Sequence, residues 1–305
     1  MTGADRDAAR GAAEDRADIE APFQPEPSRA LRGVARPLAA WTSPPRILVT
    51  NDDGVESSGL LALTRAMRSL GEVTVIAPES NQSTVGHMKT MMRPLRIRER
   101  RLGDGSPAWA IDGSPTDAVS AAFLGYFGHG FDLVASGVNH GSNLGDDVTY
   151  SGTVAAAMEA TISECPAFAV SQAHEGPAGW ALAEIAAAVV GRNILERGLD
   201  AGELLNVNVP AIAPEECAGF EITHLGRRVY HDVLVERLDP RGEPYYWIGG
   251  PPPAGVASPG TDVHAVQAGR VSVTPIHLDL TARAILRRLR EWDLALPEAG
   301  RVQAD

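Results

Sequence analysis

Residues 46–54 of this sequence read Arg46-Ile47-Leu48-Val49-Thr50-Asn51-Asp52-Asp53-Gly54. The apolar first half is typical of a short buried strand, and the polar second half ends in a glycine. A helical pattern of apolar residues then opens near Ser57 and continues to Met67. This order of strand, acidic loop and helix predicts an α/β fold, in which ligands bind just beyond the carboxyl ends of the strands. Asp52 and Asp53 would lie at such an end.

Two interpretations of the aspartate pair are open from this stretch alone. Neighbouring carboxylates repel each other unless a positive charge stands between them, and a divalent cation with oxygen ligands supplies that charge. Asp and Asn are also favoured in turns and at helix N-caps, where they bind backbone N–H groups. The first interpretation predicts a metal site at Asp52 and Asp53, and the second predicts only a turn before the helix.

The composition limits the class of protein. The chain has 305 residues, of which 44% are hydrophobic, and a formal net charge of -12. Its size suits one large α/β domain, or one domain with an appendage. The acidic balance excludes duplex nucleic acid as a partner, because phosphate binding needs clustered Lys and Arg. Cys165 and Cys217 are too far apart in the sequence for a zinc motif, and we expect no disulfide framework.

The sequence also bears on location. No apolar run approaches the roughly 18 residues that a membrane span requires, so we expect no membrane partner. The first residues are charged and lack the apolar segment of a signal peptide. A cytoplasmic location is therefore expected.

The chain divides into three parts by pattern. Residues 1–45 are rich in Ala, Arg, Asp and Pro without periodicity, which predicts a disordered extension. Residues 46–213 alternate between strand and helix patterns, which predicts a mostly parallel sheet with helices on both faces. The expected strands of this core are 47–49, 73–77, 95–101, 108–111, 132–137, 167–171 and 204–210, and its expected helices are 57–67, 116–127, 151–163 and 180–197.

Residues 214–305 follow a different pattern. We expect β pieces at 245–248 and 270–275, a Pro- and Gly-rich loop at 249–260, and a basic helix at 279–290. This C-terminal β-hairpin and helix extension could serve oligomerisation, because its aromatic strand and basic helix suit a contact with a second subunit. The alternative is that both elements cover a sheet edge of their own subunit.

The sequence contains four polar loops near expected strand ends, and the last of them opens an expected helix. They lie at 51–54, 78–86, 136–143 and 150–153, and in a doubly wound sheet they converge on one rim. Asn139 and one neutral side chain between Ser80 and Thr84 could complete the shell of a hard cation. The helix start at 150–153 presents N–H groups and hydroxyls that suit a phosphate. Ordinary turns and Ser/Thr capping remain the alternative for each loop taken alone.

Together these pieces predict metal-assisted hydrolysis of a phosphomonoester, with a metal-activated water as nucleophile. The sequence contains no GxxxxGK[ST] phosphate-binding loop and no strand–GxGxxG–helix fingerprint. His87 and His140 fall in the rim loops, and either could donate a proton to the leaving oxygen. An ordinary surface or packing role is the alternative for both.

Several motifs resemble those of the SurE family of survival-protein-E nucleotidases and phosphatases, in order and over roughly residues 46–290. They are Val49-Thr50-Asn51-Asp52-Asp53-Gly54, Ala77-Pro78 with Ser83 downstream, Gly113-Ser114-Pro115-Thr116-Asp117, Ser136-Gly137-Val138-Asn139 through Asn143-Leu144-Gly145, Tyr150-Ser151-Gly152-Thr153-Val154, Leu205-Asn206-Val207-Asn208-Val209-Pro210 and Val273-Thr274-Pro275.

The resemblance implies a Rossmann-like catalytic core at 46–213, and an extension at 214–305 used to form homodimers or homotetramers. It implies a 5′/3′-nucleotidase that depends on one divalent metal ion, Mg²⁺ or Mn²⁺. Nucleoside monophosphates would be the substrates, together with other phosphomonoesters or short polyphosphates. The implied metal ligands are Asp52, Asp53, Ser83 and Asn139, of which Asp52, Asp53 and Asn139 are also catalytic. The implied phosphate-binding residues are Asn143, Ser151, Gly152 and Thr153.

One loop departs from the family pattern. A threonine usually precedes the Gly-His pair that follows the serine ligand, whereas this chain has Val85-Gly86-His87 and then Met88-Lys89-Thr90-Met91-Met92. We expect the departure to affect substrate preference more than metal binding.

Two other functions compete with the nucleotidase prediction. A phosphatase could pass through an aspartyl-phosphate on Asp53 or Asp52. A receiver-like or nucleotide-sensing module could hold a cation without turnover. Receivers are usually shorter and carry a lysine near a late strand end, whereas the predicted core strands contain no lysine.

Overall fold

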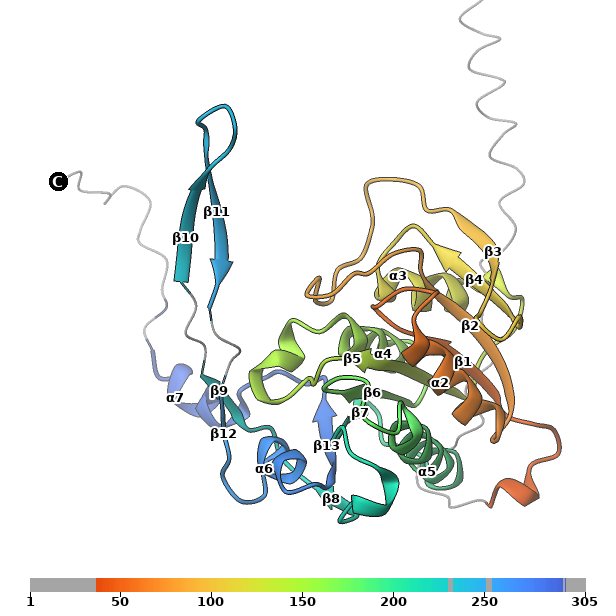
Figure 1. Ribbon diagram of the computed structural model, residues 1–305. Helices are drawn as coiled ribbons and strands as arrows, with labels where there is room; N and C mark the ends of the chain where they lie inside the picture. The colour runs from red at the N-terminus through yellow and green to blue at the C-terminus, as the bar shows by residue number, and fades with distance from the viewer. Residues whose placement is uncertain (1–36, 230–232, 251–253, 293, 295–305) are drawn as a thin grey trace, which may run out of the picture.

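The computed structural model describes residues 37–229, 233–250, 254–292 and 294 (Figure 1). Its strands are β1 (Arg46–Thr50), β2 (Glu72–Pro78), β3 (Ile97–Arg101), β4 (Pro107–Ile111), β5 (Leu133–His140), β6 (Ala167–Gln172), β7 (Glu203–Val209), β8 (Phe220–Ile222), β9 (Arg227–Val229), β10 (Val233–Leu238), β11 (Pro244–Gly249), β12 (Ala254–Val256) and β13 (Val271–His277). Its helices are α2 (Ser58–Arg68), α3 (Pro115–Ala121), α4 (Gly152–Ile162), α5 (Ala181–Arg197), α6 (Asp262–Gln267) and α7 (Leu286–Leu289). Shorter turns are η1 (Leu38–Ala40), η2 (Ala122–Tyr126), η3 (Gly145–Thr149), η4 (Pro214–Glu216) and η5 (Arg283–Ile285).

A nine-stranded sheet forms the centre of the molecule, in the order β3-β4-β2-β1-β5-β6-β7-β13-β8. The six strands from β4 to β7 in this order are parallel to one another. The chain runs outward from β1 to β2 on one side, and then returns to β5 on the other side of β1. The crevice between the carboxyl ends of β1 and β5 is therefore the point at which an α/β sheet binds ligands.

Helices cover both faces of the sheet, which confirms the predicted fold class. Alternate residues of β1 point to opposite faces, so that Ile47 and Val49 join one buried cluster and Leu48 joins the other. Helices α2 and α5 pack on the first face, and α3 and α4 pack on the second (Figure 1). No helix within the described residues is long and apolar enough to cross a membrane.

The C-terminal part contributes to the same sheet. Strand β13 pairs antiparallel with β7, and β8 pairs parallel with β13. The β10–β11 hairpin instead projects from the body of the molecule (Figure 1). Its large side chains are exposed, namely Val233, Leu234, Leu238, Tyr245, Tyr246, Trp247 and Ile248. The division of the chain at residue 213 remains a prediction.

Two predictions need correction at the helices. The basic helix expected over 279–290 is wrong in extent, since η5 begins only at Arg283 and α7 covers four residues. Asp279 accepts a hydrogen bond from Thr281 N, and its carboxylate also binds the Arg283 guanidinium. This local turn competes with the first helical turn. The helix expected over 116–127 is α3, but its last part widens into the π turn η2.

The N-terminal prediction lies mostly outside the described residues, which begin at 37. Within the described part, Leu38 and Trp41 pack against the core cluster that α5 covers. The last residues of the predicted extension therefore contact the folded body.

Candidate active site

A cavity of about 740 Å³ opens at the crevice between β1 and β5. It is lined by Asp52, Ser83, Thr84, Asn139, His140, Gly141, Ser142, Asn143, Asp147, Tyr150, Ser151 and Ile248. Five of the predicted site residues are among them: Asp52, Ser83, Asn139, Asn143 and Ser151. The four predicted loops therefore converge on one rim.

The turn after β1 is built by Asn51 and Gly54. The Asn51 amide closes the turn, because its Nδ2 donates to Gly54 O at 3.0 Å and its Oδ1 accepts from Gly54 N at 3.2 Å. Gly54 has a φ of 102°, a conformation that residues with a Cβ rarely adopt. The turn delivers Asp52 and Asp53 to the end of β1, which confirms the predicted turn, and the metal site at this pair stays a prediction.

Asp52 is bound by the start of helix α4. Its Oδ2 accepts from Thr153 N at 3.1 Å, and its Oδ1 accepts from the Thr153 hydroxyl at 2.5 Å. Gly152 permits this approach, because a Cβ there would lie 2.9 Å from Asp52 Cβ. Burial raises the pKa of Asp52 from 3.8 to about 6, against the lowering effect of the Thr153 hydroxyl, and the neighbouring Asp53 raises it further. Asp52 is thus a desolvated carboxylate that lacks a compensating charge.

Asp53 lies between two other loops. Its Oδ2 accepts from His140 N at 2.9 Å, and its Oδ1 accepts from the Asn81 side chain at 3.4 Å. Asp53 is half-buried, whereas Asp52 is only 2% exposed. The Asp53 carboxylate therefore connects the loops that follow β2 and β5.

The loop after β2 brings Ser83 to the cavity. Gln82 N donates to Asp52 O at 2.7 Å, and Ser83 N donates to Asn81 Oδ1 at 2.8 Å. Ser83 itself is exposed, and Thr84 has a positive φ of 64°. Backbone contacts thus fix the beginning of this loop, while the Ser83 hydroxyl faces open space.

Asn139 reaches the cavity from the end of β5. The register of β5 against β6 shifts between Ser136 and Asn139, and such bulges re-aim the side chains that follow. Asn139 is 8% exposed, and its Nδ2 donates to Gly141 O at 2.6 Å. Its Oδ1 accepts no hydrogen bond from the residues that the structure describes, which leaves an amide oxygen for a ligand.

Asn143 is held by hydrogen bonds to side chains of β6 and β7. Its backbone N donates to Asn208 Oδ1 at 2.8 Å, and its backbone O accepts from the side chains of Asn206 and Asn208. Its own Nδ2 donates to Ser171 Oγ at 2.8 Å. Both nitrogens of Asn143 therefore donate a hydrogen bond within the protein, which favours a role in fixing the loop.

The predicted phosphate-binding residues at the α4 start divide into two groups. Ser151 lines the cavity and caps the helix, since its Oγ accepts from Val154 N at 3.1 Å. Gly152 and Thr153 are buried beneath the cavity, and both donors of Thr153 go to Asp52. Thr153 therefore positions Asp52 in this structure, and its expected phosphate contact stays a prediction.

The donor set fits a hard divalent cation. Two adjacent carboxylates, with the neutral oxygens of Ser83 and Asn139 on the same rim, are the ligand types that Mg²⁺ and Mn²⁺ prefer. Within the described ranges, no lysine or arginine forms an ion pair with Asp52 or Asp53. The same ranges contain no group of three or more His, Cys, Asp or Glu side chains suited to a metal, so a zinc-type site is not formed there.

The two rim histidines differ in position. His140 lines the cavity and lies edge-on to Trp180, with ring centroids 5.7 Å apart. His87 is turned toward helix α4, where its Nε2 lies 3.1 Å from Glu159 Oε2. His140 is therefore the histidine that the fold brings to the site.

Sequence reasoning missed part of the site. Asn206 and Asn208 were recognised only as part of a strand motif, although two asparagines two residues apart in an apolar strand share one face and need polar partners. Tyr150 lay in a predicted loop, but Ile248 of β11 had no local signal as a cavity residue. Only the tertiary structure brings the base of the hairpin to the rim.

Comparison with known proteins places these features in a family. Residues 47–232 match the family described as survival protein SurE. The 5′-nucleotidase SurE of Geobacter sulfurreducens is 50% identical over 257 residues, covering 83% of this chain and 97% of that protein. The 5′-nucleotidase SurE of Chloroflexus aggregans is 48% identical over 81% of this chain and 98% of that protein. A crystal structure of the SurE protein from Aquifex aeolicus superposes with a TM-score of 0.68 and 37% identity, covering 81% of this chain and 98% of that one.

Proposed function

This chain belongs to the SurE family, and we propose that it is a 5′-nucleotidase that hydrolyses nucleoside monophosphates to nucleoside and phosphate. The observation that carries the proposal is the Asp52–Asp53 pair at the carboxyl end of β1. Asp52 lines the cavity at the ligand crevice of the sheet beside the neutral oxygens of Ser83 and Asn139, and Asp53 follows it in the same turn. Among the described residues, neither carboxylate forms an ion pair with a lysine or arginine. A site of this kind needs a positively charged ligand to become electrically balanced.

We assign one divalent metal ion, Mg²⁺ or Mn²⁺, to Asp52, Asp53, Ser83 and Asn139. When bound, such an ion supplies positive charge for phosphate oxygens and lowers the pKa of a water molecule. The protein's own contribution is to fix the ligands. Thr153 orients the Asp52 carboxylate, and the His140 backbone N–H orients that of Asp53.

The phosphate would lie between the metal ligands and the start of α4. Ser151 lines this part of the cavity at the positive end of the helix dipole, where an anion is stabilised. The loop at 141–143 also lines the cavity, and the hydrogen bonds on Asn143 hold it in place. Among the described residues, His140 is the one histidine that lines the cavity. We assign to its imidazole the donation of a proton to the leaving oxygen.

The cavity is large enough for a whole nucleotide, since pockets for small molecules typically have volumes of about 300–1,000 Å³. Tyr150 and Ile248 give its outer part an apolar wall that suits a nucleobase. The exposed apolar hairpin β10–β11 supports a homodimer or homotetramer, because contiguous apolar surface of this kind usually marks an interface.

The test is hydrolysis of 5′-AMP by the purified chain with Mg²⁺, with Mn²⁺ and with EDTA. We expect phosphate release with either metal and none with EDTA. Asp53→Asn should lower kcat/KM by at least about 10³-fold, because it removes a charged ligand worth several kcal/mol, while the thermal melt stays close to that of the wild type. Undiminished turnover by folded Asp53→Asn protein would refute the proposed site.

An acid quench, added to the same assay in ¹⁸O-labelled water, distinguishes direct hydrolysis from an aspartyl-phosphate route. Direct attack places the label in the phosphate during the first turnover, and no phosphorylated protein accumulates. A route through an aspartyl-phosphate, hydrolysed by attack at phosphorus, also labels the phosphate. The decisive readout is therefore a covalent phospho-enzyme trapped by acid quench.

A further inference from the structure

Outside the cavity, a buried carboxylate on α4 collects three polar partners. The Glu159 side chain is 9% exposed. Its Oε1 accepts from Lys89 Nζ at 2.8 Å and from Ser120 Oγ at 2.6 Å, and its Oε2 lies 3.1 Å from His87 Nε2. The His87 contact, followed by those of Lys89 and Ser120, lowers the pKa of Glu159 to about 2 although burial opposes this. Glu159 is thus an ionised group that binds two residues of a single loop.

That loop is the one that presents Ser83. Its first part is fixed at Gln82, whose N donates to Asp52 O. Its later part has few side chains in the core: Met91 and Met92 are 77% and 98% exposed. Between these parts, Thr84 and Gly86 both have positive φ angles. The loop therefore depends on polar contacts for its position.

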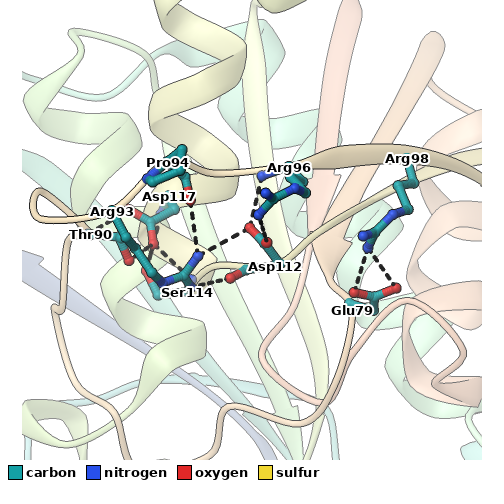
Figure 2. A network of polar contacts seen from close by, with 9 residues as sticks. All are labelled: Glu79, Thr90, Arg93, Pro94, Arg96, Arg98, Asp112, Ser114 and Asp117. Carbon is teal, nitrogen blue, oxygen red and sulfur yellow. Dashed lines mark hydrogen bonds and ion pairs between the residues drawn. The ribbon is translucent and has the colours of Figure 1, made fainter.

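Three further contacts hold the loop along α3 and α4. Gly86 N donates to Tyr150 O at 3.0 Å, and the Ser114 hydroxyl donates to Met88 O at 2.6 Å. Thr90 donates to the Asp117 carboxylate from both its backbone N and its hydroxyl (Figure 2). Glu159 and Asp117 both hold this segment through a carboxylate, and hydrogen bonds to charged groups are the stronger ones. Of the two carboxylates, Glu159 is the one that forms an ion pair with the loop, at Lys89.

Helix α4 connects this anchor to the active site. Gly152 packs against Asp52 at the helix start, and Glu159 lies about two turns later on the same face. Helix α4 therefore contacts Asp52 at its N-terminus and holds the Ser83 loop about two turns later. Both proposed ligands are positioned relative to the same helix.

We propose that Glu159 is a positioning residue, which fixes the Ser83 loop through His87 and Lys89 and thereby sets the affinity for the divalent metal. The inference rests on the proposed function, since it takes Ser83 as a metal ligand. Glu159 does not line the cavity. Its effect is therefore transmitted through the loop, as is typical of residues that orient a metal ligand without binding the ion.

The primary measurement is Mn²⁺ binding by isothermal titration calorimetry, with the full chain and its Glu159→Gln variant. Glutamine keeps the size and one acceptor oxygen but removes the charge that binds His87 and Lys89. We expect the Kd for Mn²⁺ to rise by about fivefold, and the metal concentration for half-maximal turnover to rise in parallel. The kcat at saturating Mn²⁺ should stay close to the wild-type value.

Lys89→Gln is the second variant, because Lys89 is half-exposed and its replacement leaves the core intact. The Kd of Lys89→Gln for Mn²⁺ should also rise. In both metal-free variants, amide hydrogen exchange at residues 84–90 should be faster than in the wild type. The matched control is Glu79→Gln, because Glu79 binds the two arginines Arg98 and Arg100 (Figure 2 shows the Arg98 contact). Glu79 is the first residue after β2, whereas Glu159 binds the loop further along, at His87 and Lys89. The Kd of Glu79→Gln for Mn²⁺ should match that of the wild type.

An unchanged Kd for Mn²⁺ in folded Glu159→Gln and Lys89→Gln proteins would overturn the positioning role. A purely stabilising role for Glu159 would lower the melting temperature while Kd and hydrogen exchange at 84–90 stay unchanged, and this outcome would also overturn it. The proposed function fails separately, if wild-type protein binds no Mn²⁺ or if Asp53→Asn protein binds it equally well.

Discussion

Thr153 binds the Asp52 carboxylate through both its backbone N–H and its hydroxyl, so that the first turn of α4 holds the aspartate at the end of β1. The two residues are 101 positions apart in the chain. The positive end of a helix thereby faces a carboxylate that burial has raised in pKa to about 6. The first two predictions follow from this pair.

Replacing Thr153 by valine should shift the pH dependence of catalysis. The Thr153 hydroxyl lowers the pKa of Asp52, so its loss should raise that pKa further. The acid limb of kcat/KM for 5′-AMP at fixed Mg²⁺ should then move to higher pH. Thr153→Ser keeps the hydroxyl and serves as the control. Superimposable profiles for the valine and serine variants would show that the contact has no influence on the reaction.

Replacing Asp52 by asparagine should stabilise the metal-free protein at neutral pH. The folded-state pKa of about 6 lies above the ordinary value of 3.8, so the folded state binds this proton more tightly. The stabilising contribution is fully present below pH 3.8 and is lost as the pH rises through 6. With EDTA, the free energy of unfolding of the wild type should therefore fall between pH 5 and 7.5 by about 1.4 kcal/mol more than that of Asp52→Asn.

Urea unfolding at the two pH values measures this difference. Saturating Mn²⁺ is the control, because it should restore the wild type at pH 7.5 and leave Asp52→Asn nearly unchanged. Equal pH dependence of the two metal-free proteins would contradict the assignment of Asp52 as the desolvated carboxylate.

Removing the side chain of Asn208 should damage both stability and activity. Asn208 binds both the backbone N and the backbone O of Asn143, so Asn208→Ala leaves the backbone N–H without its partner and the backbone O with the Asn206 bond alone. The free energy of unfolding should fall by about 1–3 kcal/mol, and kcat/KM should fall with it. Asn206→Ala is the matched control: Asn206 makes one bond to Asn143, and its buried Oδ1 has no hydrogen-bond partner among the described residues. It should cost clearly less, and equal losses would argue against this role of Asn208.

Replacing Trp247 on the β10–β11 hairpin should weaken assembly. The Trp247 side chain is 64% exposed and pairs in register with Val235 on a hairpin that projects from the body. We expect Trp247→Ser to lower the molar mass measured by multi-angle light scattering at micromolar concentration. Leu124→Ser removes an equally exposed apolar side chain from outside the hairpin and should leave the mass unchanged. The same mass for all three proteins would place the subunit contact elsewhere.

The parts of the fold that depend on local pattern were predictable. The strand at 46–50, its acidic turn and the helix after Ser57 follow from apolar periodicity and turn chemistry, and the structure confirms them. The helix expected at 116–127 is present as α3, which begins at Pro115, where Ser114 forms a capping box with Asp117. The basic helix expected at 279–290 is the main error, because its charges and periodicity resemble a helix whereas Asp279 closes a local turn.

Side-chain partners at the site were less predictable. Thr153 was expected to face a phosphate, since a hydroxyl at a helix start is a common anion ligand, but the fold directs it to Asp52. Likewise, nothing in the residues around His87 distinguishes a rim histidine from one that binds Glu159, 72 positions away. Such pairings depend on how α4 packs, which no local pattern contains.

Some properties of the aspartate pair at residues 52 and 53 therefore follow from the local sequence, and others depend on the tertiary structure. Its place at a strand end, and hence at a ligand crevice, follows from a short run of apolar residues, because strand and turn propensities are local. The burial of Asp52, its raised pKa and its contact with Thr153 depend on the packing of α4 against β5 and β6. Desolvation arises from atoms that are distant in the chain, and for that reason only the tertiary structure establishes the electrostatics of the site.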